Sequence, residues 1–265
     1  STLALTRHFG TRDLAGFGAD TLPIAVGAAG ALLEYVKSTQ GVNPAHIAQL
    51  AVEAPGELIR MDAATRRNLE LTETIRGEAS PTLASLLDTC ATSMGSRMLR
   101  HWLHHPIRRH DKLLRRQQAV RALLAAHQDI HTQLREVADI ERITARVALR
   151  TARPRDLAAL RDSLRALSGV KAIAATLDAP LLAELVQLLP ANSPVESLLA
   201  SAILPEPATF LRDGGVINHG YHADLDELRA IQTDCGDFLL ALEAREKERT
   251  GISTLKVEFN RVHGF

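Results

Sequence analysis

Apolar side chains that recur every three or four residues constrain this chain more than any other feature, and they are clearest within residues 59–109. Asp62 can cap a short first turn after an alternating stretch. Ser80 and Pro81 then offer a cap and a first-turn proline for a helix. Its apolar face would consist of Leu83, Leu86, Leu87 and Cys90. The spacing predicts that this segment is the hub of an all-helical core.

The next predicted helix begins at Thr92 or Ser93, either of which can cap it, and ends before Pro106. Its apolar stripe consists of Met94, Met98, Leu99, Trp102 and Leu103. We interpret the methionines and the tryptophan as helix-packing core rather than as a ligand-binding box. Replacement of a tryptophan buried in this way by alanine would lower the free energy of unfolding of the protein by about 3–5 kcal/mol.

More helices are expected toward the end of the chain. Stripes at helical spacing cover residues 113–124, 130–147, 157–167, 181–189 and 195–203. Asp111 and Pro154 are expected to open the first and the third of these helices. A longer helix is predicted to begin at Ala223 and to end at Gly251. Its stripe, spaced for packing along another helix, consists of Leu225, Leu228, Ile231, Cys235, Leu239 and Leu242.

The two ends of the chain differ from this pattern. Residues 1–54 combine turns, a helix that opens at Pro23 and a weak strand signal at 47–53. The inner side of that helix would consist of Leu22, Ala25, Ala29, Leu32, Leu33 and Val36. Apolar and polar side chains alternate over 255–259, which predicts a β-strand. The predicted fold is therefore mainly α. A multi-helix core with a long helix (55–250) follows a small α/β segment (1–54) and precedes the first strand of a β unit (251–265).

The charge of the chain is balanced overall but uneven along the sequence. With 31 basic and 31 acidic residues the formal charge is zero, so no global attraction to nucleic acid is expected. Residues 93–155, however, contain 14 Lys/Arg against 5 Asp/Glu, a surplus of 9. This stretch could contact DNA phosphates, or it could form ordinary solvated helix faces paired in part with nearby carboxylates.

Cysteine usage and hydropathy suggest a protein of the cytoplasm. Cys90 and Cys235 lie on apolar stripes without disulfide spacing, so we expect buried free thiols in a reducing compartment. No apolar run approaches the ~20 residues that a membrane span requires, and no signal peptide is recognisable. The abrupt ends of the chain suggest a fragment of a longer protein.

Six runs of residues, in one order along nearly the whole chain, resemble the core domain of bacterial MutS proteins, which recognise DNA mismatches. They are MDAATRRNLE (61–70), TLASLLD (82–88), MGSRML (94–99), RTARPRDL (150–157), RDGGVI (212–217) and GISTLKV (251–257). The resemblance implies that 1–54 is the end of a connector domain and 55–250 the core with its first lever helix. It also implies that 251–265 is the start of a clamp that closes over DNA.

The same resemblance implies a dimeric parent protein that couples mismatch binding to a weak ATPase. ATP and Mg²⁺ would bind outside this chain, double-stranded DNA would be the ligand of the parent, and a MutL-type repair protein would be its partner. DNA contact within this chain is expected in the predicted terminal strand. The residues that could hold a DNA backbone there are Lys256, Asn260, Arg261 and His263.

We expect no enzymatic activity, no bound cofactor and no catalytic residue in this chain. It contains neither a Gly-x-x-x-x-Gly-Lys-Ser/Thr phosphate loop nor a nucleophile elbow, and the Phe-x-Glu mismatch-reading motif of MutS proteins is also absent. Two alternatives remain open. The chain could be an autonomous helical scaffold that binds a protein partner along the 225–242 stripe. His101, His104 and His105 could form a metal site, although no acidic residue in their helix would complete it, and we expect no metal.

Overall fold

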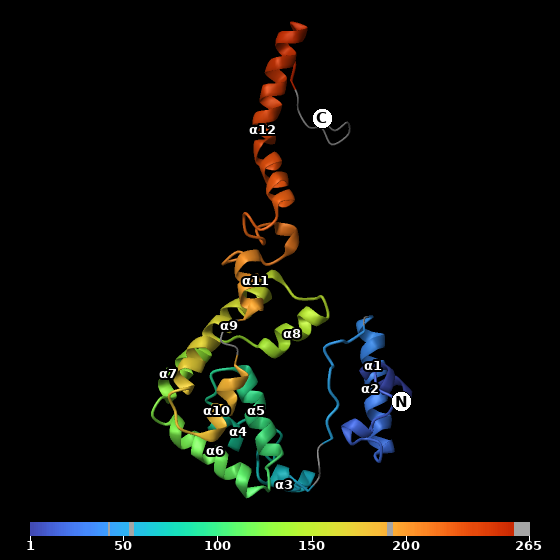
Figure 1. Cartoon of the computed structure of the whole chain (residues 1–265), viewed down its shortest axis with the longest axis vertical. Coiled ribbons are helices and arrows are strands. Elements are labelled where there is room, and N and C mark those ends of the chain that lie inside the picture. Colours follow the sequence, from blue (N-terminus) through green and yellow to red (C-terminus); the bar gives the residue numbers. More distant parts are fainter. Residues whose placement is uncertain (42, 53–55, 190–192, 257–265) are drawn as a thin grey trace. The chain divides into compact units, whose positions relative to one another are not determined.

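The computed structural model describes residues 1–41, 43–52, 56–189 and 193–256, and the regular secondary structure of this part of the chain is almost entirely helical (Figure 1). The predicted mainly α fold is confirmed. The chain divides into two compact units, Ser1–Val216 and Ile217–Phe265. The domain boundaries expected near residues 54 and 250 stay predictions.

The N-terminal part of the first unit is a pair of helices, α1 (Thr2–Phe9) and α2 (Pro23–Gln40). Their buried side chains are Leu5, Leu14, Ala19, Val26 and Leu33. The helices approach closely at Gly30, where an added Cβ would lie 2.6 Å from the Cα of Ser1. The predicted inner face of α2 is wrong in part, because Leu32 is exposed while Val26 is buried. The strand predicted at 47–53 is also wrong for the described residues 47–52, which form an irregular segment after a turn at 45–46.

The predicted hub contains two short helices, α3 (Ala63–Asn68) and α4 (Leu83–Leu87). The Asp62 carboxylate caps α3 as predicted, by accepting a hydrogen bond from the Thr65 backbone N–H at 2.6 Å. Thr82, rather than Ser80, caps α4, in a reciprocal capping box with Ser85. The predicted apolar face of α4 is wrong: Leu86, Leu87 and Cys90 are all exposed, and the buried residue is Ala84.

Helix α5 (Ser93–His104) has its predicted boundaries, and the Thr92 side chain caps it. Its predicted core packing is wrong, because Met98 and Trp102 are 50% and 44% exposed. The guanidinium of Arg116 lies 4.0 Å from the centre of the Trp102 ring and covers one face of it. The loss expected for Trp102→Ala is therefore below the ~3–5 kcal/mol of a buried aromatic side chain.

Three helices follow, α6 (His110–Leu123), α7 (His127–Arg135) and α8 (Ile140–Ala148). In α6 the predicted inward residues Val120 and Leu124 are exposed, and Ala119 is buried instead. Asp111 lies inside this helix rather than at its cap. The stripe predicted over 130–147 is divided between α7 and α8, because Asp139 caps a new helix by accepting a hydrogen bond from the Arg142 N–H.

Helix α9 (Pro154–Ala174) is the centre of the first unit, and it contacts α7, α8, α10 (Pro180–Leu188) and α11 (Pro194–Ala202). Ser163 is fully buried in it, and its hydroxyl donates to the Ala159 carbonyl and accepts from the Ala138 N–H. Gly169 lets α7 approach, since an added Cβ would lie 2.4 Å from the side-chain oxygen of Gln133. The helices expected at 157–167, 181–189 and 195–203 are confirmed.

The second unit contains the long helix α12 (Ala223–Thr250), which begins and ends where the sequence predicts. Gly251 ends it in the left-handed conformation, with a φ of 71°. Leu228 of the predicted stripe is 63% exposed, and the side chains of residues 231–235 and 237–238, which include Ile231 and Cys235, are outside the described ones. Most of the predicted terminal strand, residues 257–265, also lies outside the described residues.

Replacing a buried side chain near α9 should destabilise the first unit far more than replacing an exposed one. Ile143 of α8 is 3% exposed, so Ile143→Ala should lower the free energy of unfolding by about 2–5 kcal/mol. Val120→Ala, at an exposed position that the sequence pattern places in the core, should change it by at most about 0.5 kcal/mol. Urea unfolding of both variants measures the difference. Equal losses would contradict the burial pattern of α6 and α8.

Candidate functional site

The structure places only one of the four residues predicted to contact DNA. Lys256 is exposed beyond the end of α12. Asn260, Arg261 and His263 lie outside the described residues. Their DNA contacts stay a prediction.

The three histidines of α5 and its C-terminus have separate partners. The rings of His101 and His105 stack with centroids 4.4 Å apart, and His105 Nδ1 is 3.0 Å from the His101 carbonyl oxygen. His104 Nε2 is instead 2.9 Å from the hydroxyl of Thr72. Within the described ranges, no group of three His, Cys, Asp or Glu side chains could hold a metal ion. The arrangement gives no support to a metal site at these histidines.

Many basic residues of the 93–155 stretch form ion pairs within the chain. Those within 4.0 Å of a carboxylate are Arg97, Arg109, Lys112, Arg115, Arg142 and Arg146. Such pairs leave less of the local positive charge available for DNA phosphates. The surplus counted from the sequence therefore overstates the charge that this surface presents to DNA.

One set of charged groups joins the beginning of α5 to the beginning of α8. Arg97 donates two hydrogen bonds to the Asp139 carboxylate, at 2.7 and 2.8 Å, and a third to Glu141 at 2.6 Å. Ser93 donates to the same Asp139 carboxylate. The hydrogen bonds from Arg97, helped by that from Ser93, hold the pKa of Asp139 well below its ordinary value. Asp139 therefore both caps α8 and attaches it to α5.

A second bidentate pair joins α8 to α9. Arg146 donates to the two oxygens of Asp156, at 2.9 and 2.7 Å. Asp156 also accepts a hydrogen bond from the Arg153 N–H, which is otherwise unpaired at the start of α9. The turn between the helices is tight, and Arg150 in it has a φ of 56°, unusual for a residue with a side chain.

A buried arginine then fixes the segment that follows α11. Arg161 is only 6% exposed, and it donates to the carbonyl oxygens of Ile203, Leu204 and Pro205 at 3.3, 3.0 and 3.1 Å. Its remaining hydrogen bonds go to the carboxylate of Asp162. Sequence reasoning missed Arg161. The available signal was its spacing, since position 161 lies on the same helix face as Leu157 and Leu164.

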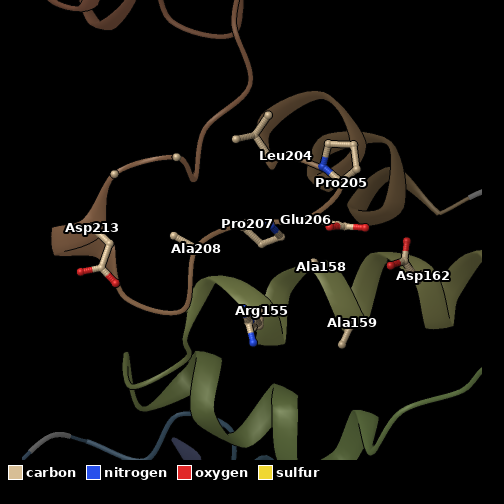
Figure 2. A pocket seen from close by; sticks show the side chains of 12 residues that line it. Arg155, Ala158, Ala159, Asp162, Leu204, Pro205, Glu206, Pro207, Ala208 and Asp213 are labelled. Atoms are coloured by element: carbon tan, nitrogen blue, oxygen red, sulfur yellow. The ribbon is translucent and has the colours of Figure 1, made fainter.

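An open groove of about 780 Å³ runs between α9 and the segment 204–215 (Figure 2). Arg155 and Asp162 line it from α9, and Glu206 and Asp213 line it from the segment. The segment folds back on itself through hydrogen bonds from Leu204 N–H to Val216 and from Ala208 N–H to Gly215. Gly214 and Gly215 have φ angles of 70° and 60°, a conformation that favours glycine. The groove separates α9 from a connecting segment. The residues that line it include no pair of a nucleophile and a general base.

A family model described as MutS domain III matches residues 64–261. The chain belongs to the MutS family. The match begins within α3 and extends past the end of α12, so it includes Arg161 and both bidentate ion pairs. It assigns the chain to the core and lever domain of a DNA mismatch-repair protein and confirms the resemblance found in the sequence. No helix of the described part of this MutS chain is long and apolar enough to cross a membrane.

Removing Arg161 should strongly destabilise the first unit. Arg161→Ala removes three hydrogen bonds to backbone carbonyls and the buried contact with the Asp162 carboxylate, and should lower the free energy of unfolding by about 3–5 kcal/mol. Arg165→Ala, one turn later on α9, removes an exposed ion pair with Glu196 and should lower it by at most about 1 kcal/mol. Urea unfolding and hydrogen exchange of the Leu204 amide compare the two. Similar losses in both variants would mean that the buried contacts do not fix the segment.

The ion pair of Asp139 should make stability depend on acid pH. Because the folded pKa of Asp139 is depressed, its contribution is present above the unfolded pKa and is lost as pH falls through the folded pKa. In Asp139→Asn, which keeps a good helix cap, the free energy of unfolding should fall less steeply below about pH 4. Asp129→Asn, on the exposed side of α7, should keep the wild-type steepness. Unfolding at a series of pH values tests this, and identical profiles for all three proteins would contradict it.

Proposed function

We propose that this MutS chain is a mechanical link, which transmits mismatched-DNA binding to a remote ATPase domain of the same longer protein. In this proposal the chain performs no catalytic step. ATP and Mg²⁺ bind elsewhere in the parent, which acts on double-stranded DNA in the cytoplasm as a homodimer and with a MutL-type partner. What this chain contributes is the transfer of a displacement along its helices.

The observation that supports the proposal most directly is the double anchoring of the segment between α11 and α12. On the side of this segment that belongs to the first unit, Arg161 donates hydrogen bonds to the three consecutive carbonyls of residues 203–205. On its second-unit side, Arg229 donates to the Ile217 carbonyl at 2.8 Å and pairs with Asp226. Asp226 in turn accepts the Gly220 N–H at 2.6 Å. Each end of the connection is thus fixed to a helix of its own unit, as a segment that transmits a displacement requires.

One observation favours the alternative of a helical scaffold. Leu228, on the predicted stripe of α12, is 63% exposed, so this part of the stripe is accessible to a protein partner. A scaffold would bind a protein along the 225–242 stripe in the absence of DNA. The two functions differ in what they require of the connecting segment, because only transmission depends on its anchoring.

Loosening the connection in the full-length protein should uncouple its activities. A Gly-Gly insertion between Glu206 and Pro207 leaves the helices intact and lengthens the anchored segment. We expect mismatched DNA to lose most of its effect on ATP turnover, while ATP turnover without DNA and DNA affinity stay near wild type. The same insertion after Ala175, in a turn where Ala175 and Thr176 are exposed, is the control. Full coupling in the 206/207 variant would contradict the proposal, and binding of a protein partner unaffected by it would favour the scaffold.

The chain of residues 1–265 by itself should bind duplex DNA weakly and without preference for a mismatch. Only contacts to the DNA backbone are expected, and each neutralised phosphate contributes about −0.9 to the slope of log K against log salt. Titration of matched and mismatched duplexes at two salt concentrations measures both properties. A clear preference for the mismatched duplex would show that recognition lies within this segment.

A further inference from the structure

A second cavity, of about 510 Å³, lies where α3 and the loop after it meet the C-terminal end of α5. Polar and charged side chains supply much of its lining. These are Arg66, Arg67, Thr72, Glu73 and His104. Most of them belong to the sequence run at 61–70 and the residues directly after it, which the transmission function leaves without a role.

The loop that forms one wall of this cavity is fixed by hydrogen bonds. Arg67 donates to the Ile75 carbonyl at 2.9 Å, and Glu70 accepts the Ile75 N–H at 2.8 Å. Thr74 is buried and bonds to Glu78 through both its N–H and its hydroxyl. Glu70 has a φ of 47°, an uncommon conformation that the surrounding bonds maintain. These hydrogen bonds therefore fix the backbone that forms this wall of the cavity.

Two buried polar atoms at this cavity have no hydrogen-bond partner among the described residues, Arg66 Nε and His104 Nδ1. An arginine Nε always carries a proton, so that atom is an unsatisfied donor. His104 Nε2 is 2.9 Å from the Thr72 hydroxyl. The Thr72 hydroxyl can donate to Nε2, and in that tautomer the proton of the neutral ring lies on Nδ1 and can be donated to a ligand.

The surroundings of His104 favour the neutral form of its ring. Burial, followed by the nearby Arg66 and His105, lowers the pKa of His104, and Glu73 opposes this only in part. The ring is thus neutral at neutral pH. The cavity combines two guanidinium groups with a neutral imidazole, against the single carboxylate of Glu73, and so favours an anionic ligand.

We propose that this cavity binds the carboxylate of an acidic side chain from a protein segment. A guanidinium edge matches the two oxygens of a carboxylate, and a buried unpaired donor regains its lost hydrogen bond when such a group reaches it. The covered position of Arg66 Nε favours an anion on a narrow side chain over the wide backbone of a DNA duplex. This inference is independent of the proposed transmission function.

The ring nitrogen signals of His104 in the 1–265 chain test the proposal directly. The probe is a glutamate residue blocked at both ends, and the matched control ligand is the same blocked residue of glutamine. Blocked glutamate should shift the His104 signals in a saturable manner, and blocked glutamine should not. Arg66→Gln should weaken the effect about tenfold or more, the loss of one charge-assisted contact. Arg76→Gln, the same change at an exposed position outside the cavity lining, should leave it unchanged.

Three results would overturn the proposal. They are the absence of saturation with blocked glutamate, an equal response to blocked glutamine, and an Arg76→Gln loss equal to that of Arg66→Gln. A duplex that shifts the His104 signals when blocked glutamate does not would assign the cavity to DNA phosphate instead. Since the comparison of the two ligands uses the wild-type chain, it remains decisive even where Arg66→Gln perturbs folding.

Discussion

The hydrogen bonds of Arg161 are the constraint on which the connecting segment depends. A guanidinium excluded from water must find partners for its donors, because each unpaired donor retains a desolvation penalty. Here the partners are three consecutive carbonyls and the adjacent Asp162. Hydrogen bonds from one planar group to three consecutive carbonyls restrict the backbone conformation of these residues, because all three oxygens must face the guanidinium. The arginine thereby selects the course of residues 203–205 as well as stabilising it.

Two carboxylates join α8 to its neighbouring helices, α5 and α9, in a similar way. Asp139 and Asp156 each cap a helix and each accept a bidentate arginine from a neighbouring helix. A carboxylate in this position satisfies the free N–H groups of one helix and fixes its distance from another. The basic stretch around them therefore has a structural use that does not require DNA. Where the arginines are more than one-third exposed, as Arg97 is, water reduces the contribution of each pair to stability.

Sequence predicted where the helices lie better than it predicted which faces they bury. Pro154 opens a helix in the structure as predicted, and Gly251 ends the last one. These signals are local, since they depend on the N–H groups and φ angles of one turn. Burial depends on neighbours distant in the sequence. Trp102 and Val120 fit a periodic stripe equally well whether or not another helix covers them, and in the described structure none covers them fully.

The candidate site was the least predictable part, for a related reason. Arginine is seldom buried, so its spacing with Leu157 and Leu164 places Arg161 at the edge of their apolar stripe and does not predict that it is buried. The hub was misplaced in the same way. Residues 59–109 have the strongest local signals, but α9 makes more of the contacts between helices because small residues such as Ser163 and Gly169 let its neighbours approach.

In the described part of the chain, the joints at the ends of the helices are fixed more strongly than the apolar faces of the helices. Directional hydrogen bonds with two or more partners fix the ends of α8, α9 and α12, whereas α4, α5 and α12 leave large apolar side chains exposed. Bonds of this kind are lost abruptly when a group is displaced, while an apolar contact weakens gradually with the area it loses. In the proposed transmission, helices fixed at their ends would move as rigid bodies about the joints. The turn at Gly214 and Gly215, whose positive φ angles carry no side-chain penalty, lies between two such joints. It is the part of the connecting segment that can change conformation without breaking the hydrogen bonds of either arginine.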